Sequence, residues 1–155
     1  MAMSFLRRNS DQVLISAEEL IKRFRDLVNH ALHQKGCAIT YDQWTVMSVL
    51  AKKQGVTQIY LAQKTLKEPA SICRILKLLQ RKGLIEKVDD KQNKRAKRIY
   101  LTPKGSEIEK QSTHIFNQIA AQGFNGVYPQ EINLFVRILD KLQGNFGDLG
   151  QQAYA

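Results

Sequence analysis

The chain has 155 residues, of which 43% are hydrophobic and 25% charged, and this is the composition of an ordinary globular protein with a real core. Its 24 lysines and arginines outnumber 14 acidic residues, so the formal net charge is +10 and favours an anionic partner, either nucleic acid or an acidic membrane surface. No apolar run approaches the roughly 20 residues that span a bilayer, which disfavours a membrane protein.

The N-terminus and the two cysteines indicate a cytoplasmic protein. Charged residues follow the first apolar ones with no hydrophobic region behind them, so the start is not a secretory signal. Cys37 and Cys73 form no C-x-x-C pair, which excludes a zinc knuckle or a dithiol redox motif. We therefore expect free thiols and no cofactor.

Two capping boxes predict the first two helices. The first box is Ser16-Ala17-Glu18-Glu19, after which apolar residues recur at helical spacing until Gly36 ends the helix. The second box is Thr40-Tyr41-Asp42-Gln43, and it opens a helix that Gly55 closes.

The middle of the chain predicts two further helices and a β-hairpin. Thr57 can cap a short helix from Gln58 to about Thr65, and Pro69 suits the first turn of the next helix. The second of these helices has an i, i+3, i+4, i+7 stripe for burial, made of Ile72, Ile75, Leu76 and Leu79. Residues 84–88 and 96–101 then read as two strands around a polar loop.

Two long helices are predicted after the hairpin. Thr102-Pro103 caps the fifth helix and Pro129 opens the sixth, and we expect a flexible tail from Gly144. The first and last helices carry broad apolar faces, far in sequence from the compact middle. Such faces must be buried, and a dimer interface built from both ends of the chain is the economical answer.

The segment from Gln58 to Gly105 contains several short motifs. They are Leu61-Ala62, Ser71-Ile72-Cys73-Arg74, Arg81-Lys82-Gly83-Leu84-Ile85, and Asn93-Lys94-Arg95 followed after five residues by Leu101-Thr102-Pro103-Lys104-Gly105. This segment resembles the winged helix-turn-helix of the MarR (multiple antibiotic resistance regulator) family, whose wing signature is D-x-R-x5-L-T-x-x-G. The flanking helices match in order, from about Asp11 to Gln143.

The resemblance implies a mainly α fold with a small β-wing. Residues 1–37 would supply the N-terminal helix of a dimerisation region, 38–102 a winged helix-turn-helix DNA-binding domain, 103–143 the C-terminal helices of the dimerisation region, and 144–155 a flexible tail. It also implies a bacterial, homodimeric repressor or activator that binds a pseudo-palindromic operator in double-stranded DNA and answers to a small ligand or an oxidant.

The sequence departs from the family pattern at two positions. The wing aspartate is Asn93, so its contact with Arg95 becomes a weaker neutral one, unless Asp89 or Asp90 substitutes. Cys73 stands where the family usually has a hydroxyl residue, and a thiol is a poor hydrogen-bond donor.

The helix from Pro69 carries a basic stripe opposite its apolar one. Ala70 and Ser71 are short enough for the backbone to approach the major groove, and Ser71 near the helix start also suits a phosphate. Arg74 suits bidentate contact with guanine, whereas Lys77 and Arg81 are expected to meet phosphates. The plainer alternative is a solvated charged face.

In the wing, Arg95 is predicted to enter the minor groove, with Lys94 and Arg98 on the DNA backbone. The alternative is that these charges only keep the hairpin soluble and discourage edge pairing. The predicted DNA-binding set is Ala70, Ser71, Cys73, Arg74, Lys77, Arg81, Lys94, Arg95 and Arg98.

The predicted ligand site lies between the first, second and fifth helices. Its residues, chosen by placement, are Phe24, His30, Trp44, Met47, His114 and Ile115; the alternative is that they are core. A zinc site from His30, His33, Cys37 and His114 is disfavoured because Gly36 breaks the helix before Cys37, so we expect no metal. Cys73 is either an oxidation switch or an inert, half-buried thiol, and the second is favoured.

Two other functions compete with DNA binding. A winged helix that binds a protein predicts an apolar outer face on the helix from Pro69, whereas this face is basic. An enzyme using Cys73 or Cys37 with a histidine predicts a catalytic motif beside them, and the sequence has none. The sequence therefore predicts a DNA-binding regulator and not an enzyme.

Overall fold

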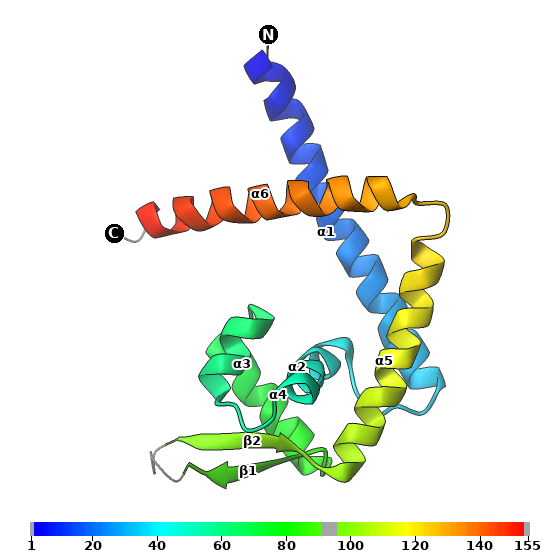
Figure 1. Cartoon of the computed structure of the whole chain (residues 1–155), viewed down its shortest axis with the longest axis vertical. Helices are drawn as coiled ribbons and strands as arrows, with labels where there is room; N and C mark the ends of the chain where they lie inside the picture. Colours follow the sequence, from blue (N-terminus) through cyan, green and yellow to red (C-terminus); the bar gives the residue numbers. More distant parts are fainter. Residues whose placement is uncertain (1, 91–95, 154–155) are drawn as a thin grey trace. The chain divides into compact units, whose positions relative to one another are not determined.

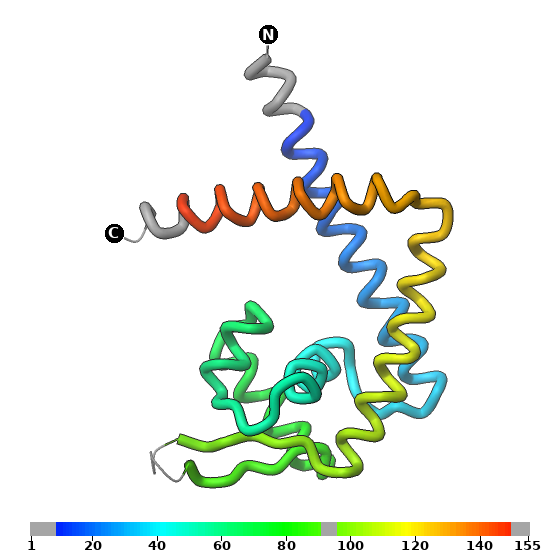
Figure 2. The backbone as a smooth tube through the Cα atoms, viewed as in Figure 1, coloured from blue at the N-terminus to red at the C-terminus, as the bar shows by residue number. Residues whose placement is uncertain are grey.

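The computed structural model describes the backbone of residues 2–90 and 96–153 and the side chains of 9–90 and 96–149 (Figures 1 and 2). Its elements are α1 (Ala2–Gln34), α2 (Tyr41–Lys52), α3 (Gln58–Thr65), α4 (Pro69–Arg81), β1 (Ile85–Asp89), β2 (Lys97–Leu101), α5 (Pro103–Gly123) and α6 (Pro129–Ala153). The chain divides into two compact units, 1–119 and 120–155. The expected fold, mainly α with a two-stranded wing, is confirmed.

The core of the first unit lies where α2, α3 and α4 pack on one another and on the strands. Met47 of α2, Leu61 of α3 and Leu76 of α4 have no exposed surface, and Ile99 of β2 is 1% exposed. Val28 and Leu32 near the end of α1 close the core from the other side. Each such side chain contributes about 1.5–3 kcal/mol by leaving water.

The helix starts are set by local hydrogen bonds, as the sequence predicts. The Thr40 hydroxyl accepts from the Gln43 amide and the Gln43 side chain accepts from the Thr40 amide, both at 3.3 Å, which completes the second capping box. The Thr57 hydroxyl accepts from Tyr60 at 3.3 Å, and Pro69 opens α4. These caps satisfy amides that have no partner inside the helix.

The wing is an antiparallel hairpin that runs from Ile85 paired with Leu101 to Asp89 paired with Lys97. Figure 2 follows the backbone from α4 through both strands into α5. Val56, just before α3, pairs with Ile99, so a third short segment fixes the hairpin to the helices. The base of the wing is therefore part of the core.

Two expected boundaries are wrong. α1 begins at Ala2 and runs through the capping box at Ser16, because residues 2–15 contain no glycine or proline to end a helix. The flexible tail expected from Gly144 is helical to Ala153. Glycine costs about 1 kcal/mol in a helix but does not stop one, and Phe146 and Leu149 continue the apolar spacing of α6.

Broad apolar faces remain exposed on α1 and α6, with exposed fractions between 37% and 62%. On α1 they are Val13, Leu14, Ile15, Leu20, Ile21 and Leu27, and on α6 Leu134, Phe135, Val136, Ile138, Leu139, Phe146 and Leu149. Faces of this extent on a folded chain mark an interaction surface.

Gly105 provides a test of how tightly α5 is held against the wing. A Cβ atom there would lie 1.9 Å from the Leu84 carbonyl oxygen, which accepts from the Thr102 amide. Because backbone cannot yield as a side chain can, Gly105→Ala is expected to lower the free energy of unfolding by about 3 kcal/mol or more. Gly123→Ala, with no atom within 4 Å of the new Cβ, is the control and is expected to be neutral or slightly stabilising. Urea denaturation measures both, and equal losses would contradict this packing.

Candidate nucleic-acid interface

The outer face of α4 is basic, as its helical spacing predicts. Arg74, Lys77 and Arg81 are exposed, while Ile72 and Leu76 on the opposite side have no exposed surface. At the start of the helix Ala70 is exposed and Ser71 half-buried, and Cys73 is half-buried beside the stripe. The burial of one face of α4 therefore decides which side chains the other face presents.

The start of α4 is held in place by its neighbours. Leu66, which ends α3 in a left-handed conformation at φ 51°, turns the chain between the two helices. Next to it, the Lys67 ammonium pairs with Asp42 of α2 at 2.5 Å. The Gln58 side chain donates to the Pro69 carbonyl at 3.4 Å. The angle between α3 and α4 is thus fixed by contacts from both sides.

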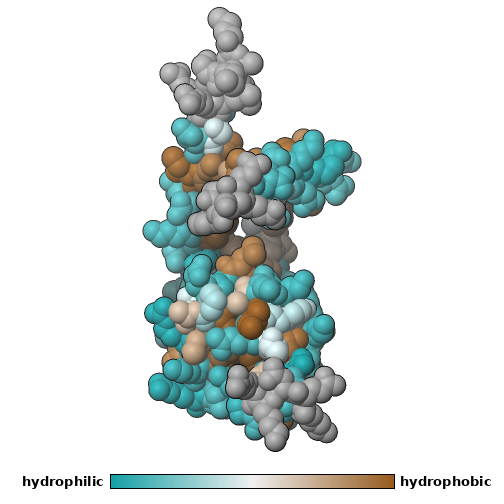
Figure 3. Space-filling view, turned by 90° about the vertical axis from the view of Figure 1, so that its left-hand side faces the viewer, coloured by the Kyte–Doolittle hydropathy of each residue, from teal (hydrophilic) through white to brown (hydrophobic). Residues whose placement is uncertain are grey.

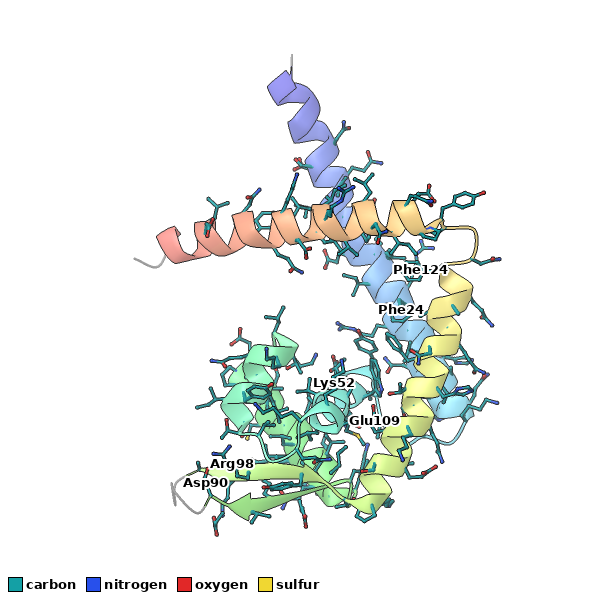
Figure 4. The ribbon with its side chains drawn as sticks, in the orientation of Figure 1. Phe24, Lys52, Asp90, Arg98, Glu109 and Phe124 are labelled. Atoms are coloured by element: carbon teal, nitrogen blue, oxygen red, sulfur yellow. The ribbon has the colours of Figure 1, made fainter. Side chains whose placement is uncertain are left out.

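The wing is anchored by a buried carboxylate. Asp90 is 8% exposed and accepts from the Arg98 guanidinium, with Nε and Oδ2 2.5 Å apart (Figure 4). The same guanidinium donates to the Gly55 carbonyl at 3.1 Å. Arg98 therefore ties the far end of the strands to the segment before α3. Lys94 and Arg95, with Asn93, lie outside the described residues.

A groove of about 450 Å³ lies between α3 and the strands. Its lining is Thr57, Gln58, Ile59, Lys87, Ala96, Lys97 and Ile99. Figure 3 shows the side of the molecule on which α3 and the wing lie, where a hydrophilic surface is interrupted by small hydrophobic areas. Polar, basic and apolar groups thus meet between α3 and the wing.

Sequence reasoning missed part of this surface. Ile59, an apolar residue of the helix predicted from Gln58 to about Thr65, is 70% exposed. On an eight-residue helix whose buried residue is Leu61, a position two residues earlier points about 200° away. The helical wheel drawn from Leu61 alone would have placed Ile59 outside.

Comparisons with known proteins show what the chain is similar to. A model of the MarR family matches residues 39–96, from just before α2 into the wing. A MarR family regulator from Silicibacter pomeroyi is 26% identical and superimposes with a TM-score of 0.66, covering 83% of this chain and 88% of that one. Residues 39–96 of the chain therefore resemble the MarR family, and the structure shares the fold of that regulator.

Two further crystal structures share the fold of this chain. One is a MarR family transcription regulator, 23% identical, with a TM-score of 0.82 over 97% of this chain and 99% of that one. The other is MepR of S. aureus, solved as a complex with DNA, 23% identical, with a TM-score of 0.78 over 84% of this chain and 96% of that one. Both alignments cover most of this chain and nearly all of the other chain.

The predicted ligand residues occupy different environments. Phe24 and Trp44 pack around Phe116, with ring centroids 5.2 Å and 4.2 Å from it. Met47 and Ile115 are buried in the core, whereas His30 and His114 are exposed. The six therefore do not form one cluster, and their role in ligand binding stays a prediction.

A polar chain, which the sequence did not predict, lies beside the aromatic rings. The Trp44 indole donates to Thr113 at 2.9 Å, and the Thr113 hydroxyl donates to Glu109 at 2.7 Å. Glu109, labelled in Figure 4, is 8% exposed. Its partner Thr113 lies four residues later on α5, one helical turn away. This i, i+4 spacing in the sequence could have predicted the hydrogen bond.

Two further properties of the described residues bear on metal binding and membrane insertion. No group of three or more histidine, cysteine or acidic side chains among them is placed to hold a metal ion. None of the helices in the described part is both long and apolar enough to cross a membrane. Cys37 is buried and Cys73 half-buried, and both are free thiols.

The bond between Arg98 and buried Asp90 predicts that substitutions of two neighbouring cations in β2 differ in their effect on stability. Arg98→Ala removes a charged partner of buried Asp90, so the free energy of unfolding is expected to fall by about 2 kcal/mol. Lys97→Ala breaks a pair with Asp89 in which both side chains are more than half exposed, and the expected loss is below about 1 kcal/mol. Urea denaturation compares the two. A loss for Lys97→Ala as large as that for Arg98→Ala would refute the anchoring role.

Proposed function

We propose that the chain is a sequence-specific regulator of transcription that binds double-stranded DNA as a homodimer. The observation that carries the proposal is the exposed basic face of α4. A helix is the right width for the major groove, and a basic surface supplies the sequence-independent attraction to phosphate.

Within α4 we assign different roles to different positions. Arg74 reads a base edge, since its side chain is exposed one turn after the short residues Ala70 and Ser71 that let the backbone approach. Lys77 and Arg81 contact phosphates further along, and Cys73 lies beside the groove-facing stripe. Ser71, near the helix start, also meets a phosphate.

For the wing we propose contacts outside the major groove. Lys94 and Arg95 lie in the sequence between the two strands, and we propose Arg95 for the minor groove and Lys94 for the DNA backbone. Arg98 is bound to Asp90 and to the Gly55 carbonyl, so we propose that it positions the wing and meets the DNA backbone with its exposed side. The complex of MepR with DNA, a protein of the same fold, supports this use of the domain.

The dimer is proposed from the apolar faces of α1 and α6. Residues 1–37 and 103–143 would form the dimerisation region, and 38–102 the DNA-binding domain. A two-fold dimer presents two α4 helices, so the operator is proposed to be a pseudo-palindrome. Burying side chains such as Leu20, Ile21 and Phe135 in that interface removes apolar surface from water.

We further propose that the regulator is a repressor released by a small ligand or an oxidant. The ligand would lie near the aromatic cluster of Phe24, Trp44 and Phe116, where α1, α2 and α5 meet. Because the proposed partner is DNA, we place the protein in the cytoplasm. The proposal assigns it no catalytic activity.

Substitutions on α4 test the division of roles. Arg74→Ala is expected to relax base preference by about 1–3 kcal/mol at one position of each half-site. Lys77→Ala is expected to weaken binding to all sequences alike and to lower the salt slope by about 1. Fluorescence anisotropy with labelled duplexes, at several salt concentrations, measures both. Lys110→Ala, an exposed cation on α5, is the control and is expected to change neither quantity. If Arg74→Ala and Lys110→Ala behaved alike, α4 would not be the reading helix.

A further inference from the structure

A cavity of about 330 Å³ lies on the first unit. It is bounded by the loop between α1 and α2, the end of α4 and the first turns of α5. Its lining is Gly36, Ala38, Ile39, Lys82, Leu84, Lys104 and Ile108. None of these belongs to the predicted DNA-binding or ligand-binding sets. The volume lies in the range of small-molecule sites.

Lys82 supplies one cation to this cavity. Its ammonium donates to the Ala38 carbonyl at 2.5 Å and to the Gln43 side chain at 2.9 Å. An ammonium has three N–H donors, so these two bonds leave one donor for a ligand. Partial burial lowers the pKa of Lys82, since the charge leaves water without gaining an anionic partner.

Lys104 supplies the second cation from the first turn of α5. Its ammonium donates to the backbone carbonyl of Lys82 at 3.2 Å, which brings both lysines to the same wall. Throughout 9–90 and 96–149, no carboxylate pairs with either ammonium. Two cations without a counter-ion therefore border one cavity.

The other walls are aliphatic. Ile39 and Leu84 are buried core residues whose side chains reach the cavity, and Ile108 of α5 is half-buried. These walls have no aromatic ring and no acidic group. A ligand that matches the site needs a negative group at one end and a hydrocarbon body at the other.

We propose that this cavity binds a small organic carboxylate with an aliphatic body. The two carboxylate oxygens would accept charge-assisted hydrogen bonds from Lys82 and Lys104, which are stronger than bonds between neutral groups. The hydrocarbon would leave water against Ile39, Leu84 and Ile108. The binding does not depend on whether the chain binds DNA, so the two proposals fail independently.

Titration of the uniformly ¹⁵N-labelled full chain with hexanoate at pH 7 tests the site. Amide NMR shifts are expected to saturate at Gly36, Leu84 and Ile108. Hexanamide, which has the same shape without the charge, is expected to bind about tenfold more weakly, and so is acetate, which has the charge without the hydrocarbon. Equal binding of hexanoate and hexanamide, equal binding of hexanoate and acetate, or no saturable shift at these amides would overturn the proposal.

Substitutions test whether hexanoate binding depends on Lys82 and Lys104 or only on the positive charge of the surface. Lys104→Met is the main test, because Lys104 is exposed and its loss does not threaten folding. It is expected to weaken hexanoate binding about tenfold, whereas Lys110→Met on the same helix is expected to leave it unchanged. Lys82→Met is expected to weaken binding too, but it also removes the donor to Ala38, so it is interpreted only if its amide spectrum stays native. Wild-type affinity in Lys104→Met would show that the cavity is not the site.

Discussion

The candidate interface depends on the burial of one stripe of α4. Ile72, Leu76 and Leu79 have no exposed surface, and this apolar contact fixes the rotation of the helix about its own axis. A helix held in this way cannot turn to hide its basic residues without exposing the core. The positions of Arg74, Lys77 and Arg81 on the surface are therefore a consequence of packing.

The wing depends on a second set of contacts that link distant parts of the chain. Val56 pairs with Ile99, and the Arg98 guanidinium bridges buried Asp90 and the Gly55 carbonyl. At the other end of the hairpin, Gly105 lets α5 approach the Leu84 carbonyl more closely than any side chain would allow. The hairpin is thus fixed at both ends to the same core that holds α4, which sets the distance between helix and wing.

Features that depend on near neighbours could be predicted from the sequence. The caps at Thr40 and Thr57, proline at the start of α4 and the stripe from Ile72 to Leu79 all follow from residues within one or two helical turns. The start of α1 could not be predicted in this way. A capping-box sequence can also occur inside a helix when no residue before it ends that helix.

The sequence pattern could not predict contacts between residues that lie far apart in the chain. Arg98 was expected either to contact DNA or to keep the hairpin soluble, yet its guanidinium bonds to a carbonyl 43 positions earlier. Lys82 was noted only as part of a family motif, although its ammonium reaches a carbonyl 44 positions away. Both depend on how the helices fold together, which periodicity and capping do not specify. The same holds for the cavity that Lys82 borders.

The central claim is that α4 and the wing read duplex DNA in a two-fold arrangement. Selection of bound sequences from a random duplex library by the full chain, followed by titration of the selected site against a random duplex at two salt concentrations, tests it most directly. The account predicts an inverted repeat with half-sites about one helical turn apart and affinity that falls steeply with salt. Equal, salt-insensitive affinity for selected and random duplexes would contradict it.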